Sequence, residues 1–381
     1  MSESPVEQFS GGEAGSIEVL DLTGIDEAQR VMTVCNACRY CEGLCATFQA
    51  MALRREFATA DLTYMAHLCH GCTACYHDCQ YAPPHEFSIN VPRAMSTLRQ
   101  QSYAHLAWPR ALGGLFRNHG NKFLLASVSS LVVLLSLAVW AHGQALIEPH
   151  TGVGSFYQVV SHGLMVTVAG GTFLFALFSM LLSAVRYWRE LRASSSLAIR
   201  PEHVWQACKD AAQLKNLDGG HGQGCQVGDD HPSLWRRRWH HCTMWGFFAC
   251  FASTSVATLY HYAFGWVAPY AYTSLPVLLG TVGGIGLVIG PIGQLWLKRK
   301  MHPAVIDPAA VQLESALLWS LLLVSITGLA LLALRDTAWM GTLLIVHLAV
   351  VLTFFLMMPY SKFVHGIYRL LALVHFAAER Q

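Results

Sequence analysis

Six long apolar stretches constrain the fold of this 381-residue chain more than any other feature. They run from Phe123 to Ala141, Phe156 to Val185, His241 to Phe264, Leu275 to Leu297, Leu313 to Leu334 and Trp339 to Met358. Each is long enough to cross about 30 Å of hydrocarbon as a helix that rises about 1.5 Å per residue. Composition agrees, because charged residues make up only 13% of the chain, about half the usual share. We therefore expect a membrane protein with two spans in residues 122–185 and four in residues 240–381.

The charges that flank these stretches predict their orientation. The first 25 residues contain no basic region followed by an apolar run, so we expect a flexible N-terminus without a secretory signal. Lys and Arg gather on the N-terminal side of the bilayer, whereas the opposite loops contain only Arg335. The positive-inside rule then places both termini and the polar loop 186–239 in the cytoplasm. The net charge of +2 gives no support to a nucleic-acid partner.

Two identical cysteine motifs precede the apolar stretches. Each has the spacing C-x2-C-x2-C-x3-C, formed by Cys35, Cys38, Cys41 and Cys45 and again by Cys69, Cys72, Cys75 and Cys79. In this spacing three thiolates bind one cubane cluster and the fourth reaches the neighbouring cluster. The motifs thus predict two [4Fe-4S] clusters. One is held by Cys35, Cys38, Cys41 and Cys79, and the other by Cys69, Cys72, Cys75 and Cys45.

Zinc and disulfides are the alternatives for these cysteines. Structural zinc favours C-x2-C pairs with longer spacers, and disulfides are rare in a reducing cytoplasm. Ala46 and Gln80 stand where a proline usually follows the fourth cysteine of such a motif. The 23 residues between the motifs read as helical, so residues 26–121 resemble the all-helical ferredoxin domain of succinate dehydrogenase and heterodisulfide reductase. The expected fold is all-α, a helical ferredoxin-like domain followed by a six-helix, cytochrome b-like bundle.

The other four cysteines carry less information. Cys208 and Cys225 lie in the loop 186–239, near His203, His221 and His231. Two interpretations remain open: these residues form a metal site, or they are ordinary loop residues. Cys242 and Cys250 lie in the third span, where a small apolar residue is the simplest interpretation.

Histidines in the spans are the second group of candidate ligands, because ionisable groups in a bilayer are costly and usually functional. His347 and His365 are five helical turns apart, so we expect both on one helix face near opposite sides of the membrane, provided that Pro359 between them does not kink the helix badly. In the third span His240 or His241 lies at the inner end and His261 at the outer end. The angle between positions favours His240 over His241 as the residue on the face of His261.

Two helices that each carry an inner and an outer histidine can bind one or two b-type haems. The inner pair would be His365 with His240 or His241, and the outer pair His347 with His261. His162, in the second span, is an alternative outer ligand. Hydrogen bonding at the membrane interface is the simpler role for any one of these histidines alone.

Several segments resemble known families. Met358–His365 reads Met-Pro-Tyr-Ser-Lys-Phe-Val-His and resembles the haem-binding helix of the cytochrome b subunit of membrane-bound nitrate reductase. The order of twin cluster motifs, the stretch Cys69–Glu86, six spans and the stretch Phe251–Tyr262 resembles the CitB/TcuB family of tricarballylate-utilisation proteins over nearly the full chain. That resemblance implies a protein of the bacterial inner membrane. It would reoxidise the flavin of FAD-dependent tricarballylate dehydrogenase, which converts tricarballylate to cis-aconitate, and pass the electrons to membrane quinone.

Other functions remain open at this point. The chain could be the membrane arm of another flavoprotein or of a thiol-disulfide reductase, or a membrane-anchored cluster sensor, or a transporter. A sensor would need an output domain, and transport would favour carboxylates within the spans, where Glu314 is the nearest case. No Gly-rich dinucleotide loop follows a strand, and the glycines of Thr281–Gly290 lie inside an apolar span. We therefore expect an oxidoreductase component without a substrate site of its own.

Overall fold

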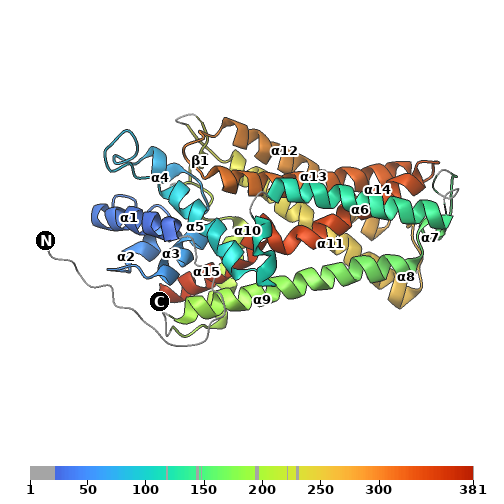
Figure 1. Cartoon of the computed structure of the whole chain (residues 1–381), viewed down its shortest axis with the longest axis horizontal. Coiled ribbons are helices and arrows are strands. Elements are labelled where there is room, and N and C mark those ends of the chain that lie inside the picture. The colour runs from blue at the N-terminus through green and yellow to red at the C-terminus, as the bar shows by residue number, and fades with distance from the viewer. Residues whose placement is uncertain are drawn as a thin grey trace.

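The computed structural model describes residues 22–116, 119–142, 146, 148–193, 197–220, 222–228 and 231–380 (Figure 1). In this part of the chain nearly all regular structure is helical, as the sequence predicts, and the two strands are only two residues long. The predicted flexibility of residues 1–25 falls mostly outside the described residues.

Five helices form the N-terminal domain: α1 (Leu22–Cys38), α2 (Ala46–Ala52), α3 (Thr59–Leu68), α4 (Ala74–His77) and α5 (Val91–Leu106). The start of α5 follows from its sequence, because the Asn90 side chain accepts a hydrogen bond from the Arg93 amide and Pro92 stands in the first turn. Apolar side chains of α1, α3 and α5 meet in a core that includes the fully buried Met32 and Leu98. The 3-10 helix η1 (Arg110–Phe116) leads from this domain to the first span.

Six helices of the described chain are long and apolar enough to cross a membrane. They are α6 (His119–His142), the continuous series α8 (His162–Met165), π-helical η3 (Val166–Gly170) and α9 (Gly171–Ala193), then α11 (Trp235–Phe264), α12 (Leu275–Lys300), α13 (Pro308–Leu334) and α14 (Met340–Met357). The short helix α7 (Ser155–Val159) lies at the far end of the bundle from the N-terminal domain (Figure 1). The protein is therefore a multi-pass membrane protein.

The polar segment between the second and third spans is partly ordered structure. It contains helix α10 (Pro201–Gln213) and an antiparallel pair of strands, β1 (Cys225–Gln226) and β2 (Pro232–Ser233), in which Cys225 faces Ser233. Contacts between this segment and the N-terminal domain include a hydrogen bond of 2.7 Å that Thr73 Oγ1 donates to the Gln226 carbonyl. Gly220, at a positive φ of 85°, lies against the Leu44 backbone.

The helix that carries His347 does not continue to His365. Helix α14 ends at Met357, and two 3-10 turns follow, η4 (Met358–Tyr360) and η5 (Lys362–Val364), before α15 (His365–Glu379) begins. Pro359 has no amide hydrogen to continue the helix, and Ser361 has an extended backbone while its hydroxyl accepts from the Phe363 amide. The expectation of one helix with both histidines on one face is therefore wrong.

Helix α15 turns back onto the N-terminal domain and lies beside α3 and α10 (Figure 1). Its buried Leu373 and Phe376 belong to the same apolar core as the residues of α1, α3 and α5. Near its end, Glu379 pairs with Arg54 and accepts a hydrogen bond from the Tyr64 hydroxyl at 2.8 Å. The N-terminal domain and α15 thus form one packed unit.

Candidate metal centres

One group of four cysteines lies at the end of α1 and in the turns beside it. Cys35, Cys38, Cys41 and Cys79 line one pocket, together with Phe48 and Tyr81 among other residues. We call these four residues the first cysteine set. Three come from the first motif and Cys79 comes from the second. The side-chain amide nitrogen of Gln80, Nε2, lies 4.0 Å from the Cys38 sulfur.

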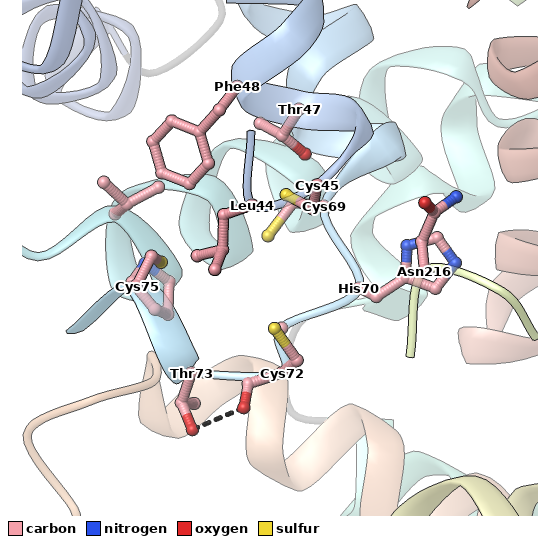
Figure 2. Close-up of a pocket in the computed structure, with 13 residues that line it drawn as sticks. Leu44, Cys45, Thr47, Phe48, Cys69, His70, Cys72, Thr73, Cys75 and Asn216 are labelled. Carbon is pink, nitrogen blue, oxygen red and sulfur yellow. Dashed lines mark hydrogen bonds between the residues drawn. The ribbon is translucent and has the colours of Figure 1, made fainter. Parts of the chain in front are cut away.

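The other four cysteines of the two motifs line a second pocket, drawn in Figure 2. This second cysteine set contains Cys45, Cys69, Cys72 and Cys75, so it too takes three residues from one motif and the fourth from the other. The loop Cys69–Thr73 is compact because Gly71 and Thr73 both have positive φ, at 60° and 67°. Backbone turned in this way can direct amide hydrogens toward a bound anion or iron–sulfur cluster.

The thiols of each set lie close enough to affect one another. Burial, followed by the neighbouring Cys79, Cys41 and Cys38, raises the pKa of Cys35 to about 12. Burial and then Cys72 and Cys69 raise the pKa of Cys45 to about 12. Buried thiols that raise one another's pKa do not ionise together without a cation to compensate their charges. The donor sets therefore suit a metal cofactor that binds thiolates.

The spacing of the sulfurs bears on which metal cofactor fits. Among the described residues, no group of three or more His, Cys, Asp or Glu is arranged to hold a single metal ion. Tetrahedral zinc draws its thiolates in to bonds of about 2.3 Å, whereas a cluster of several iron atoms holds them further apart. The motif spacing favours an iron–sulfur cluster over structural zinc, which uses C-x2-C pairs with longer spacers.

Two histidines from separate helices lie close together. The rings of His240, on α11, and His365, at the start of α15, have centroids 6.2 Å apart and planes inclined by 31°. Two imidazoles on opposite sides of one iron, with metal–nitrogen bonds near 2 Å, place their centroids about 6 Å apart. The structure thus brings these two residues, which we call the inner histidine pair, to a separation that an iron between them requires.

Hydrogen bonds leave the inner histidine pair free to coordinate. His365 Nδ1 donates to the Lys362 carbonyl at 2.5 Å, so Nε2 carries the lone pair. His240 Nδ1 is buried without a hydrogen-bond partner in the described chain. His241 makes no described contact with His365, and its buried Nε2 also lacks a partner there. His240 therefore fits the inner position better than His241.

The outer histidines are arranged differently from the predicted pairing. The His261 ring stacks on His162 with centroids 3.9 Å apart and an interplanar angle of 19°. His347 instead shares a hydrogen bond with Thr327 Oγ1 at 3.0 Å, through Nδ1. No described contact joins His261 to His347. The stacked rings of His162 and His261 lie too close together to hold an iron between them in this arrangement.

The remaining cysteines include one that sequence reasoning did not connect with the motifs. Cys225 is fully buried and packs against Cys72 of the second cysteine set. Cys208 is exposed, and Cys242 and Cys250 are half-buried on α11. His221, one of the histidines considered for a loop metal site, lies outside the described residues. The spacing of Cys225 from the motifs carries no signal of its contact with Cys72, which depends on the β1–β2 turn.

Comparisons with known proteins cover nearly the whole chain. The family model of citrate utilization protein B matches residues 115–381, and the model of the Fer4-like domain of citrate utilization protein B matches residues 28–105. A citrate utilization protein B from Escherichia coli is 50% identical over 355 residues, which cover 93% of this chain and 92% of that protein. No solved structure matches.

Proposed function

Because this chain belongs to the citrate utilization protein B family, we propose that it transfers electrons from the reduced flavin of a partner dehydrogenase to membrane quinone. The observation that carries this proposal is the position of the donor sets. Both cysteine sets lie in the N-terminal domain, and the inner histidine pair lies on α11 and α15, which also contact the loop of the second cysteine set through Arg236 and Arg369.

The two cysteine sets would hold two [4Fe-4S] clusters, which is consistent with the Fer4-like name of the matching domain. Each cluster would supply a site that accepts and releases one electron at a time. The chain contributes four thiolates per site, a buried surrounding and the positive-φ turn at Gly71 and Thr73. The same turn fixes Cys72 and Cys75 relative to one another.

The inner histidine pair would hold haem b. Helices α11 and α15 would supply one imidazole each, and the Lys362 carbonyl would orient the ring of His365. A second haem would use His261 with His347 or with His162; His162 and His261 would then have to unstack.

The donor in this proposal is FAD-dependent tricarballylate dehydrogenase or a related flavoprotein. It would dock on the N-terminal domain from the cytoplasmic side of the inner membrane, because the basic residues that flank the spans gather on that side. The relative from Escherichia coli is named for citrate utilization, which is consistent with a dehydrogenase that acts on a tricarboxylate. The chain itself would handle electrons and not the carboxylate substrate.

The first experiment measures the cofactors directly. Anaerobically purified protein should contain about eight non-haem irons and about eight acid-labile sulfides per chain, and its reduced spectrum should show haem b. Cys38→Ala and Cys72→Ala should each remove about half of the iron and sulfide. Cys208→Ala is the matched control, because Cys208 is exposed and outside both sets, and it should leave both contents unchanged. Stoichiometric zinc in place of iron would refute the proposal.

The second experiment follows the electrons. Membranes that contain this protein and the dehydrogenase should show haem reduction when the dehydrogenase substrate is added, and reoxidation when a quinone analogue is added. Cys38→Ala and Cys72→Ala should slow the reduction strongly, and Cys208→Ala should not. Substrate-driven haem reduction that persists after both cysteine motifs are removed would contradict the proposed route.

A further inference from the structure

Three arginines from three separate elements bind the backbone of the loop that carries Cys69 and Cys72. Arg99, on α5, donates to the Cys69 carbonyl at 2.6 Å. Arg369, on α15, donates to the same carbonyl at 2.8 Å. Arg236, on α11, donates to the Gly71 carbonyl and, at 3.4 Å, to the His70 carbonyl. We call these residues the three loop arginines.

Two of the loop arginines share their helices with the inner histidine pair. Arg236 precedes His240 by four residues on α11, and Arg369 follows His365 by four residues on α15. Residues four apart lie one turn apart on the same helix face. Each helix therefore presents one histidine to the inner histidine pair and one arginine to the loop. One turn of α11 and one turn of α15 thus connect the second cysteine set with the inner histidine pair.

Among the described residues, the first cysteine set has no comparable group of cations. The described arginine contact with its loop is that of Arg39, an exposed side chain that donates to the carbonyl of Asn36 within the same turn. Asp78 directly precedes Cys79 of this set and adds a negative charge. The two sets therefore differ in the charge around them: cations at the second and an acid at the first.

Positive charge near a cluster stabilises its reduced form, because reduction adds a negative charge. Arg99 is almost fully buried and Arg369 is partly buried, so solvent screens their charges little. An arginine guanidinium stays protonated in proteins, so both side chains carry a positive charge.

We propose that the three loop arginines give the second cysteine set the higher reduction potential of the two cluster sites and make it the site that faces the haem. This inference rests on the proposed function. One electron would leave the first site and enter the second without any bond being formed or broken. The loop arginines are positioning and electrostatic residues, and they touch neither substrate nor metal.

The test is a potentiometric titration of the intact, cofactor-loaded protein, with each cluster followed by its electron paramagnetic resonance signal. Arg369→Gln and Arg236→Gln should lower the potential of one cluster and leave the other unchanged. Arg369→Lys, which keeps the charge, should restore most of the shift. Arg237→Gln is the matched control, because Arg237 lies on the same turn of α11 but donates to the Gln213 carbonyl; it should move neither potential.

A second measurement needs no arginine variant. Cys38→Ala removes a ligand of the first set, so the remaining cluster should titrate at the higher of the two wild-type potentials. Cys72→Ala should leave the cluster with the lower potential. The reversed order, or arginine variants that shift both clusters equally or neither, would overturn this inference. Absence of clusters from the wild-type protein would instead refute the proposed function, so the two failures are distinguishable.

Discussion

Replacement of Glu379 by alanine tests how firmly α15 is docked on the N-terminal domain. The Glu379 carboxylate contacts three side chains: the guanidinium of Arg54 at 2.5 Å, the hydroxyl of Tyr64 at 2.8 Å and the imidazole of His375 at 3.3 Å. Alanine is the best helix former, so the substitution carries no penalty in helix propensity. The measured effect would come from these contacts alone.

The size of the effect follows from what remains after the change. The Glu379 and Arg54 side chains are only 10% and 14% exposed, so this pair is not a screened surface contact. Loss of one partner of a fully buried pair costs about 3–5 kcal/mol. Arg54 keeps Asp61 at 2.6 Å, however, so its charge does not become unpaired. We therefore expect α15 to lose about 2 kcal/mol of docking free energy, closer to the value of one hydrogen bond to a charged group.

Hydrogen–deuterium exchange of the amides in the last two turns of α15 measures this loss. A change of 2 kcal/mol corresponds to exchange that is about 30-fold faster where local opening limits it. The matched control is Glu27→Ala, which removes an ion pair with Arg30 whose side chains are 46% and 45% exposed. Such a surface pair contributes about 0–1 kcal/mol. If both variants exchange at the same rate, the apolar face of α15 holds it alone and the reasoning is wrong.

The same contact predicts a pH dependence. Burial would raise the pKa of Glu379, but hydrogen bonds from His375 and Arg54 outweigh it and hold that pKa below its usual range. The contribution of a carboxylate with a lowered pKa is complete above its ordinary value and is lost as the pH falls through the lowered value. Protection of α15 by this contact should therefore be complete above the ordinary carboxyl range, decline as the pH falls below that range and be lost below the lowered pKa of Glu379, and Glu379→Ala should remove this pH dependence.

Two further predictions concern the histidines and a glycine turn. His365→Ala should remove the haem held by the inner histidine pair, whereas His347→Ala should leave its spectrum unchanged, because His347 contacts Thr327 instead; equal effects of both variants on that signal would contradict the pairing. Gly220→Ala should destabilise the cluster region by about 1–3 kcal/mol, because a Cβ would lie 2.2 Å from the Leu44 carbonyl oxygen at a φ of 85°. Faster loss of cluster absorbance in denaturant would measure this effect, and an unchanged rate would count against it.

The sequence was most informative about the membrane helices. The predicted start at Leu275 and end at Phe264 agree with α12 and α11, because apolar runs of this length fit few structures other than membrane helices. The helices also continue beyond the apolar runs, as α11 does by beginning at Trp235, because arginine and lysine are good helix formers. Hydropathy identifies the part of a helix in lipid but not where the helix ends.

The candidate metal centres could be predicted only where their residues are close in the chain. Motif spacing identified the eight cysteines, and periodicity favoured His240 over His241. The contacts of Arg236 and Arg369 with the Cys69 loop depend on packing between segments more than 150 residues apart. One local signal was present, since each arginine lies four residues from a histidine on the same helix. Helical spacing alone predicted that His347 and His365 share one helix. The turn at Pro359 and Ser361 instead puts them on two separate helices.

The docking of α15 also has a consequence for the order of synthesis. The N-terminal domain leaves the ribosome before any membrane helix is made, yet its apolar core includes Leu373 and Phe376. The core stays incomplete, with the side of α3 that faces α15 uncovered, until all six spans have been translated and α15 has emerged. Loading of iron–sulfur clusters into a finished domain is therefore expected only after membrane insertion. A nascent chain stopped before residue 365 should accept and retain its clusters poorly.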